Sequence, residues 1–551
     1  MKNVVRVLCL LLACLFCLLA VAACKKDGKK GPGSSSVNVR VDEAGVRWAE
    51  DEWGVWREYD NLPDEELDYD DEPISFLYWT GGGTVKAEFA QTEEVDNDRL
   101  SSIYKRNESI MDRLGIEFVW TSEPGNSETM NSFVARVQRA KDSETHDFDL
   151  IGAYSRSQGV LLAAGLVQNL SAIENSYIDT AKPWWPANLS GNLAIKGNLY
   201  YVSGDISTNA IDQMHCVYFN KKLLNNNYGA EAAKYFASNP HVKTAAAADK
   251  TNPEGGDTAS NMLYEKAYAG LWTLDDLLGL AANTYIDSKS DGVTADDTFG
   301  MCSINYCVAA LYGASNLRMI ESTTDGTILK ISDDWASSKT LRLVERLNSL
   351  FSTTSYHTNT TTTAGYFQPF NNGKCYFALY YMRMAEDFLL NNDKVDSYGI
   401  LPVPKFDAQQ KNYYTVIGNE FSIYSVFIDF DTRGDEQATL SMFSAIIECW
   451  ASEAYRKTTP VIFELNMKLK SSPTQCEADM CEIVRRSIEF DMGRIFGAQF
   501  SGEIDKSFSM DGQMAQAAQY GSSWATVIDQ NLDRIKTNLA DFCSGLQKTL
   551  V

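Results

Sequence analysis

The sequence predicts an α/β protein that is divided into two lobes. The first indication is the order strand, helix, strand between residues 146 and 224, where apolar runs of strand length occupy 147–154, 199–202 and 216–219. The second is the length of 551 residues, which is too great for one hydrophobic core. Alternating strands and helices with short loops form layered sheets, which bind ligands at the carboxyl ends of their strands.

The N-terminal segment has the features of an export signal. Residues 1–23 hold two basic residues followed by an apolar run, which is typical of a signal peptide. The segment ends in Ala-Val-Ala-Ala directly before Cys24, which resembles a bacterial lipobox and predicts cleavage there with lipid on the Cys24 thiol. An ordinary signal peptide with a chance cysteine, or an uncleaved anchor, is the alternative. Residues 25–36, rich in Lys, Gly and Ser, are typical of a flexible tether.

Charge and cysteine usage exclude some functions. The chain has 73 Asp and Glu against 49 Lys and Arg, and a nucleic-acid partner is excluded because phosphate binding needs a basic face. The spacing of the cysteines and the four scattered histidines fit no zinc pattern. Disulfides and buried free thiols both remain open for the cysteines after Cys24, which are Cys216, Cys302, Cys307, Cys375, Cys449, Cys476, Cys481 and Cys543.

An acidic arm follows the tether. Residues 42–72 are rich in Asp and Glu, yet they also carry Trp48, Trp53, Trp56 and Tyr59, which a purely disordered tail would lack. We therefore expect an extended arm that packs partly on the first lobe. The alternative is that these aromatic side chains form a sugar-binding platform.

The elements of the first lobe follow in a regular order. We expect a strand and its loop at 74–83, a helix at 107–114, a strand at 115–120 and a helix at 130–140, which lead into the segment 146–224. Trp79 lies in the first strand-end loop, where it would face the cleft, although a position in the core of the lobe is the alternative.

The second lobe begins with the strand at 216–219. A helix is expected at 271–285, where Thr273 and Asp276 have the spacing of a capping box. The turn after it resembles a calcium loop through Asp287, Asp291 and Asp297. Lys289 stands where an oxygen ligand is needed and Thr298 replaces the bidentate Glu, so a plain acidic turn is favoured. The remaining expected segments are 298–315, 366–388, 398–405, a return at 413–427, and helices at 437–453, 476–491 and 524–546.

The order of several phrases resembles a known family. The phrases are DLI with GLVQNLS (149–171), GNLYYVSG with VYFNKKLL (197–224), the segment 366–388 and YGILPVPK (398–405). Together they are similar to the family-1 extracellular solute-binding proteins of carbohydrate ABC importers. The resemblance implies a two-lobed, class II periplasmic-binding-protein-like fold with hinge crossings. The implied division is a signal peptide at 1–23, tether and arm at 24–72, one lobe at 73–210 and 415–460, and the other at 211–414 and 461–551.

The resemblance also implies a function. The protein would stand on the extracellular face of the bacterial cell membrane, capture a carbohydrate (an oligosaccharide) in the cleft and deliver it to ABC permease subunits. We expect a monomer without a cofactor. Since strand neighbours alternate in direction, only one of Tyr380 and Tyr381 should contact ligand. The expected ligand-binding residues are Trp79, Tyr154, Arg156, Asp205, Asp212, Tyr306, Tyr380, Arg383 and Glu420.

No catalytic motif is found. The sequence contains no G-x-S-x-G, H-E-x-x-H or phosphate-binding glycine loop, and no C-x-x-C after the expected signal peptide, in which Cys14 and Cys17 have that spacing. We expect a binding protein. Two alternatives stay open: a surface lipoprotein enzyme that acts on glycans with two carboxylates across a cleft, and a sensor or adhesion module on the same fold.

Overall fold

The structure is a computed structural model, which describes most of the chain. Its described residues are 37–549 apart from 52, 64–66, 82–85, 240–255, 257, 324–327, 359–361, 390–391, 396, 468–474, 498–516, 519–520 and 522. The predicted signal peptide, Cys24 and the tether therefore lie outside the described residues. Within the described part, no helix is both long and apolar enough to cross a membrane.

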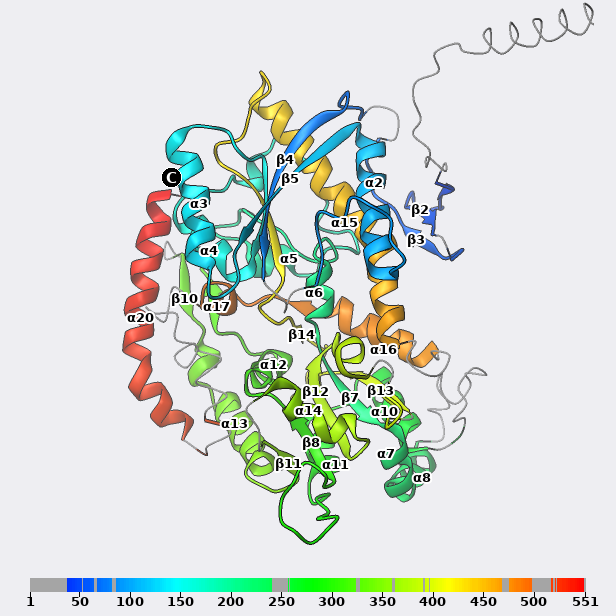
Figure 1. The fold of residues 1–551 in the computed structure, drawn as a ribbon. Helices are drawn as coiled ribbons and strands as arrows, with labels where there is room; N and C mark the ends of the chain where they lie inside the picture. Colours follow the sequence, from blue (N-terminus) through cyan, green and yellow to red (C-terminus); the bar gives the residue numbers. More distant parts are fainter. Residues whose placement is uncertain are drawn as a thin grey trace, which may run out of the picture.

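The first lobe is built on a four-stranded sheet in the order β15-β6-β4-β5 (Figure 1). Strand β4 pairs in parallel with β5 and β6, and β15 joins antiparallel from more than 260 residues further along the chain. The strands are β4 (Glu72–Thr80), β5 (Ile116–Pro124), β6 (Leu150–Tyr154) and β15 (Ser422–Val426). The helices around them are α2 (Asp98–Leu114), α3 (Met130–Ser143), α4 (Ser155–Ala163), α5 (Leu189–Leu193) and α15 (Glu436–Met467).

The second lobe contains a five-stranded sheet in the order β11-β8-β12-β7-β13. Strands β7, β8 and β12 are buried along their whole length. Strands that are buried on both faces have mostly apolar sequences without alternation of polar residues, as is seen here. The strands are β7 (His215–Asn220), β8 (Phe299–Ser303), β11 (Tyr356–His357), β12 (Cys375–Tyr381) and β13 (Tyr398–Pro402).

Helices surround this second sheet. The capping box predicted for α11 is present, because Asp276 accepts from Thr273 N at 3.0 Å. The helices are α7 (Lys221–Asn227), α8 (Gly229–Ser238), α10 (Ala259–Tyr268), α11 (Leu274–Ala281), α12 (Val308–Ala314), α13 (Ser338–Phe351), α14 (Thr363–Asn371) and α16 (Gln475–Arg486).

Short segments connect the two lobes. Helix α6 (Thr208–Asp212) leads into β7, and β14 (Thr415–Val416) pairs in parallel with β16 (Ile488–Glu489). Two of the crossings touch, since Gly418 N donates to Gln213 O at 2.8 Å. This contact places the segments that carry the chain between the lobes side by side.

Several smaller elements lie beside the crossings and along the lobes. Helix α20 packs against α4 of the first lobe and against α13 of the second, and Figure 1 shows it running along the side of both. These elements are β9 (Ile320–Ser322), β10 (Leu329–Ile331), α17 (Met492–Ile495) and α20 (Trp524–Thr549).

The acidic arm contains more regular structure than an extended chain. It forms a three-stranded antiparallel sheet of β1 (Val39–Val41), β2 (Arg47–Glu50) and β3 (Trp56–Glu58). Its end is fixed to the first lobe, because Tyr59 is buried and Arg113 forms an ion pair with Asp60 at 2.8 Å. The short turns that close this sheet use Asp42 and Asp51 as side-chain acceptors, a role that favours Asp in turns.

The cysteines after Cys24 are all buried free thiols. The five-residue spacing of Cys302 and Cys307, and of Cys476 and Cys481, therefore closes no disulfide loop in this structure. Burial raises the pKa of the Cys307 and Cys481 thiols, so they contribute to the apolar core of the second lobe.

Candidate ligand-binding site between the lobes

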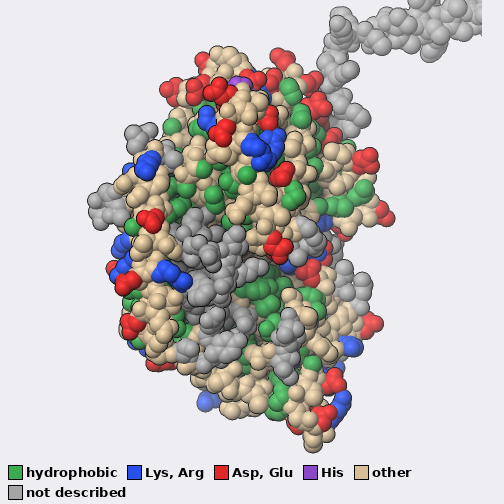
Figure 2. All heavy atoms as spheres, turned by 60° about the vertical axis from the view of Figure 1, so that its left-hand side comes forward, with side chains coloured by type: hydrophobic (Ala, Val, Ile, Leu, Met, Phe, Trp, Pro, Cys, Tyr) green, Lys and Arg blue, Asp and Glu red, His purple; other side chains and the backbone are tan. Residues whose placement is uncertain are grey.

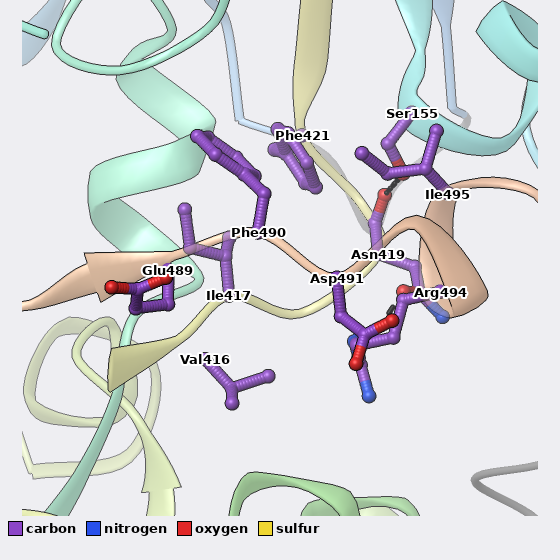
Figure 3. Close-up of a pocket in the computed structure, with 10 residues that line it drawn as sticks. All are labelled: Ser155, Val416, Ile417, Asn419, Phe421, Glu489, Phe490, Asp491, Arg494 and Ile495. Atoms are coloured by element: carbon purple, nitrogen blue, oxygen red, sulfur yellow. Dashed lines mark hydrogen bonds between the residues drawn. The ribbon is translucent and has the colours of Figure 1, made fainter. Parts of the chain in front are cut away.

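A small open cavity lies where the two lobes meet, and Figure 3 shows its lining. In the space-filling view, hydrophobic side chains gather in a hollow at mid-height of the molecule (Figure 2). The cavity is built by the start of α4, the segment from β14 to β15, and the segment from β16 to α17. Its lining residues are Ser155, Val416, Ile417, Asn419, Phe421, Glu489, Phe490, Asp491, Arg494 and Ile495.

Polar contacts fix the upper wall of this cavity. Ser155 Oγ donates to Asn419 O at 2.6 Å, and Arg494 Nη2 donates to Asn419 Oδ1 at 3.1 Å. Asp491 caps α17 by accepting from Gly493 N at 2.7 Å. Glu489 accepts hydrogen bonds from the side-chain amides of Asn188 and Asn192, and it forms an ion pair with Arg318 at 2.7 Å. Arg494 is thus the cationic group that this wall brings to the cavity.

A group of tyrosines lies next to the cavity in the second lobe, outside its lining. It is connected to the lining through His215, which contacts both Val416 and the Tyr381 ring. The rings of Tyr306 and Tyr381 stack with their centroids 6.0 Å apart and an interplanar angle of 19°, and Tyr380 lies 4.6 Å from Tyr381. Tyr306 is 41% exposed, whereas Tyr380 and Tyr381 are buried. The Arg383 guanidinium is 5.7 Å from the centre of the Tyr381 ring. An exposed aromatic face beside a charged planar group is suited to a sugar ring and its hydroxyl groups.

Strand alternation separates Tyr380 from Tyr381. Tyr381 points to the crossing segments and lies 4.7 Å from the His215 ring, whereas Tyr380 packs against Phe367 at 4.4 Å inside the lobe. Tyr381 is therefore the member of the pair that faces the crossings. Ligand contact by the predicted Tyr380 stays a prediction.

His215 is the titratable group beneath these tyrosines. Its Nδ1 lies 2.8 Å from Val416 O, and since a carbonyl only accepts, Nδ1 carries the proton. Burial, and then the charge of Arg494, lower the pKa of His215 to about 3. The imidazole is consequently neutral at physiological pH.

Trp79 and Tyr154 lie together in the first lobe. The Trp79 ring is 5.1 Å from the Tyr154 ring, and its Nε1 donates to Ser422 Oγ at 2.8 Å. Both side chains are buried in the sheet. This is the core position that the sequence offered as the alternative for Trp79.

The two predicted carboxylates are each held by an arginine. Asp205 pairs with Arg485 at 3.1 Å, and Asp212 accepts from Arg99 at 2.8 and 2.9 Å. Both aspartates are buried, and neither belongs to the lining of the cavity. Burial raises the pKa of each carboxyl, while its arginine acts in the opposite direction. In this structure they join elements of the two lobes.

The remaining predicted residues lie around the tyrosine group. Arg383 pairs with Asp387 at 3.1 Å and stands 3.8 Å from Glu420. A Cβ added at Gly497 would lie 3.9 Å from Arg156 Nη2, so Arg156 lies close to the end of α17. The structure therefore brings Tyr306, Tyr380, Arg383 and Glu420 together. Asp212 is adjacent to this group, since Arg383 N donates to Asp212 O at 3.1 Å, whereas Asp205 pairs with Arg485.

Sequence reasoning missed Ser155 and Arg494. Ser155 is the first residue of α4, and Arg494 belongs to a helix of only four residues, which is too short to show helical periodicity. The Asp491 capping position was the one signal available, since Asp before a short run of helix is a start signal.

The predicted calcium candidates do come together. Carboxylate oxygens of Asp287, Asp291 and Asp297 lie within 4.8 Å of one another. Backbone N–H groups already bind two of them: Asp297 accepts from Ser288 N at 2.9 Å and from Thr294 N at 2.8 Å, and Asp287 accepts from Gly292 N at 3.2 Å. Lys289 pairs with Asp296 at 2.6 Å. These contacts are those of an acidic turn, and the absence of calcium from it stays a prediction.

Comparison with known proteins identifies the fold. No family model matches this chain, and neither does any curated protein. Among solved structures, a cyclo/maltodextrin-binding protein complexed with maltotetraose has a TM-score of 0.50 at 12% identity, over 86% of this chain and 99% of that one. A family 1 extracellular solute-binding protein from Bifidobacterium longum subsp. infantis has a TM-score of 0.47 at 11% identity, over 86% and 99%.

A third similar structure is the galacto-N-biose-/lacto-N-biose I-binding protein of the ABC transporter from Bifidobacterium longum, in complex with lacto-N-biose. Its TM-score is 0.46 at 9% identity, over 87% of this chain and 99% of that one. At such identities a likeness is informative about the fold alone. The chain, as its sequence predicts, has the two-lobed α/β fold of the solute-binding proteins.

Proposed function

We propose that this protein is an extracellular solute-binding protein of the family-1 class, which captures a carbohydrate between its lobes for an ABC importer. The observation that carries the proposal is the stacked pair of Tyr306 and Tyr381, with Arg383 beside it, at the junction of the lobes. Sugar rings present flat C–H faces that pack on aromatic rings, and their hydroxyl groups pair with planar polar side chains.

Binding would work by a shift between open and closed forms. A ligand that contacts both lobes only in the closed form stabilises that form by its differential affinity. Ligand would rest on the Tyr306 face and meet Arg494 and Asn419 from the crossing side. A micromolar dissociation constant corresponds to about −8 kcal/mol, which a stacked ring and a few hydrogen bonds supply after the costs of association.

Thermal-shift titration with oligosaccharides tests the binding function. A ligand that binds only the native state raises the melting temperature, so at least one sugar should do so. Tyr306→Ala should abolish most of that shift. Trp53→Ala is a matched control, because Trp53 is 40% exposed on the arm, as Tyr306 is 41% exposed in the site. Equal loss in both variants, or no shift with any sugar, would contradict the proposal.

Membrane anchoring belongs to the same proposal. Lipid on Cys24 would hold the protein at the extracellular face of the membrane, close to the permease subunits that receive the ligand. Cys24→Ser should move the protein from the membrane fraction to the medium. Retention of the variant in membranes after washing with high salt and carbonate would contradict the lipid anchor. Loss of sugar uptake on deletion of the gene, with rescue by the wild type, tests delivery.

A further inference from the structure

Two buried polar side chains at the crossings lack hydrogen-bond partners. Gln213 is fully buried, and within the described part of the chain neither Oε1 nor Nε2 of its amide has a partner. The same is true of Nε2 of the buried His215. Buried polar groups nearly always form hydrogen bonds in folded proteins, so two neighbouring side chains with unsatisfied polar atoms need an explanation.

The two side chains lie where the chain enters β7. Gln213 ends α6 as its C-cap, Met214 forms a bridge to Ile417, and His215 is the first residue of β7. A Cβ added at Gly418 would lie 2.2 Å from Gln213 Oε1 and 2.6 Å from Tyr381 Cε1, so the amide and the ring meet over Gly418. His215 contacts the same ring. Both polar groups therefore lie directly beneath the tyrosines of the candidate site.

The chemistry of the unpaired atoms is definite. His215 carries its proton on Nδ1, which leaves Nε2 as an acceptor only. The Gln213 amide supplies one acceptor and a donor group. His215 Nε2 can only accept a hydrogen bond, so it cannot bind an ionised carboxylate or a phosphate oxygen. A sugar hydroxyl group can donate to Nε2 and can also bond to the Gln213 amide. Two arginines lie nearby: Arg383 is paired with Asp387, and Arg494 donates to the uncharged Asn419 amide oxygen.

We propose that Gln213 and His215 hydrogen-bond the hydroxyl groups of an uncharged sugar, which reaches them when the Tyr381 ring moves aside. The inference rests on the proposed carbohydrate-binding function and narrows it to neutral sugars. The two side chains form the floor of the site, and Tyr306 and Tyr381 form its wall. In the bound state, the polar atoms that have no partner here become satisfied.

The variant Gln213→Met tests this assignment. Methionine keeps the length and shape of the side chain and removes its polar atoms, so the contacts with Gly418 and Tyr381 remain. Because an unpaired amide is lost, the melting temperature of the ligand-free variant should be unchanged or higher. Its affinity for sugar should fall at least tenfold. If Gln213 only supported the fold, the variant would have a lower melting temperature and an unchanged affinity for sugar.

Tyr201→Phe is the matched control. The Tyr201 hydroxyl is also buried and also lacks a partner among the described residues, but Tyr201 belongs to the core of the first lobe. This variant likewise removes an orphan polar atom, and it should leave sugar affinity unchanged. A comparable loss of affinity in Tyr201→Phe would show that any change in buried polarity alters binding, and would overturn the assignment.

The probes are maltotetraose, cellotetraose, mannotetraose and xylotetraose as neutral sugars, with trigalacturonic acid and a mannuronate trisaccharide as acidic ones. Calorimetric titration should detect a neutral ligand. If only acidic sugars bind, or if Gln213→Met binds the neutral sugar as tightly as the wild type, the inference fails while the carbohydrate-binding function stands. If no sugar binds, the proposed function fails as well.

Discussion

The Arg99 guanidinium on α2 forms two hydrogen bonds with the Asp212 carboxylate, at 2.8 and 2.9 Å. The same guanidinium donates to Glu386 at 2.7 Å. Arg99 belongs to the first lobe, Asp212 to a crossing segment and Glu386 to the second lobe. Three parts of the molecule that are distant in the chain thus meet in one buried charged cluster, and Asp212 is committed to it.

Removal of the Asp212 charge should therefore destabilise the protein. Asp212→Asn leaves the buried Arg99 partly uncompensated, and breaking a buried pair from one side costs about 3–5 kcal/mol. Asp147→Asn, which breaks a partly exposed pair with Arg136, is the control and should cost less than about 1 kcal/mol. Urea unfolding of both variants gives the comparison. Equal free energies of unfolding would show that the cluster contributes no more than a surface pair.

Trp79→Ala should destabilise the ligand-free protein. Trp79 is 2% exposed and its Nε1 is bonded to Ser422, so truncation leaves a cavity and an unpaired hydroxyl. Such a change costs roughly 3–5 kcal/mol. Melting curves without ligand provide the measurement. If the melting temperature holds while sugar affinity falls, Trp79 is a cleft residue and its buried position here belongs to the closed form.

Glu448 should make stability depend on pH. Burial raises the pKa of this carboxyl from 4.5 to about 8, although Trp185 and other N–H donors act against the shift. Between these values the native state binds more protons than the unfolded chain. The contribution of Glu448 is therefore fully present below pH 4.5 and is lost as the pH rises to about 8.

Glu448→Gln measures this effect. The variant stays neutral, so its stability relative to the wild type should improve between about pH 5 and pH 8, by on the order of 3 kcal/mol. The loss of one acceptor for Trp184 Nε1 gives a constant offset that does not change with pH. Glu436→Gln, at the exposed start of the same helix, should show no such trend. A flat difference for Glu448→Gln would refute the buried, protonated carboxyl.

Gly418→Ala should disturb the candidate site. The new methyl group would overlap Gln213 Oε1 and the Tyr381 ring, at 2.2 and 2.6 Å, so both side chains must shift. Sugar affinity should fall by tenfold or more, which corresponds to about 1.4 kcal/mol. Gly279→Ala is the control, since nothing lies within 4 Å of a Cβ there and the site is on helix α11. That change should stabilise the protein by about 1 kcal/mol.

Calcium should have little effect on stability. The carboxylates of Asp287 and Asp297 already accept backbone N–H groups, and Lys289 pairs with the neighbouring Asp296. Melting temperatures in calcium and in a chelator should therefore agree. A fall in the chelator that is restored by calcium alone would make this turn a metal site.

Much of the fold could be predicted because it depends on local patterns. The strands at 74–83, 147–154 and 216–219 were expected from apolar runs, and the capping box of Thr273 from its spacing. Boundaries were less accurate, since the helix expected to end at 453 continues to Met467 with Pro460 inside it. A proline normally ends a helix, and here packing overrides that preference.

The site was harder to predict because it depends on partners distant in the sequence. An aspartate in a crossing segment has the same local pattern whether it meets a sugar or an arginine. Asp212 meets Arg99, which precedes it by 113 residues, and Asp205 meets Arg485, which follows it by 280. Arg383 could be placed in the cleft because the segment 366–388 resembles a passage of the family, and Tyr306 because the segment 298–315 was expected to cross the second lobe.

Helix α20 limits how the lobes can rotate. Its first residue, Trp524, packs edge-to-face on Trp335 with the centroids 4.6 Å apart, and the helix also packs on α4 of the other lobe. A helix of 26 residues is about 39 Å long and does not stretch. A rod fastened at both ends keeps the distance between its attachments constant. The lobes can therefore separate on the side away from α20, while their edges along this helix stay at a fixed distance.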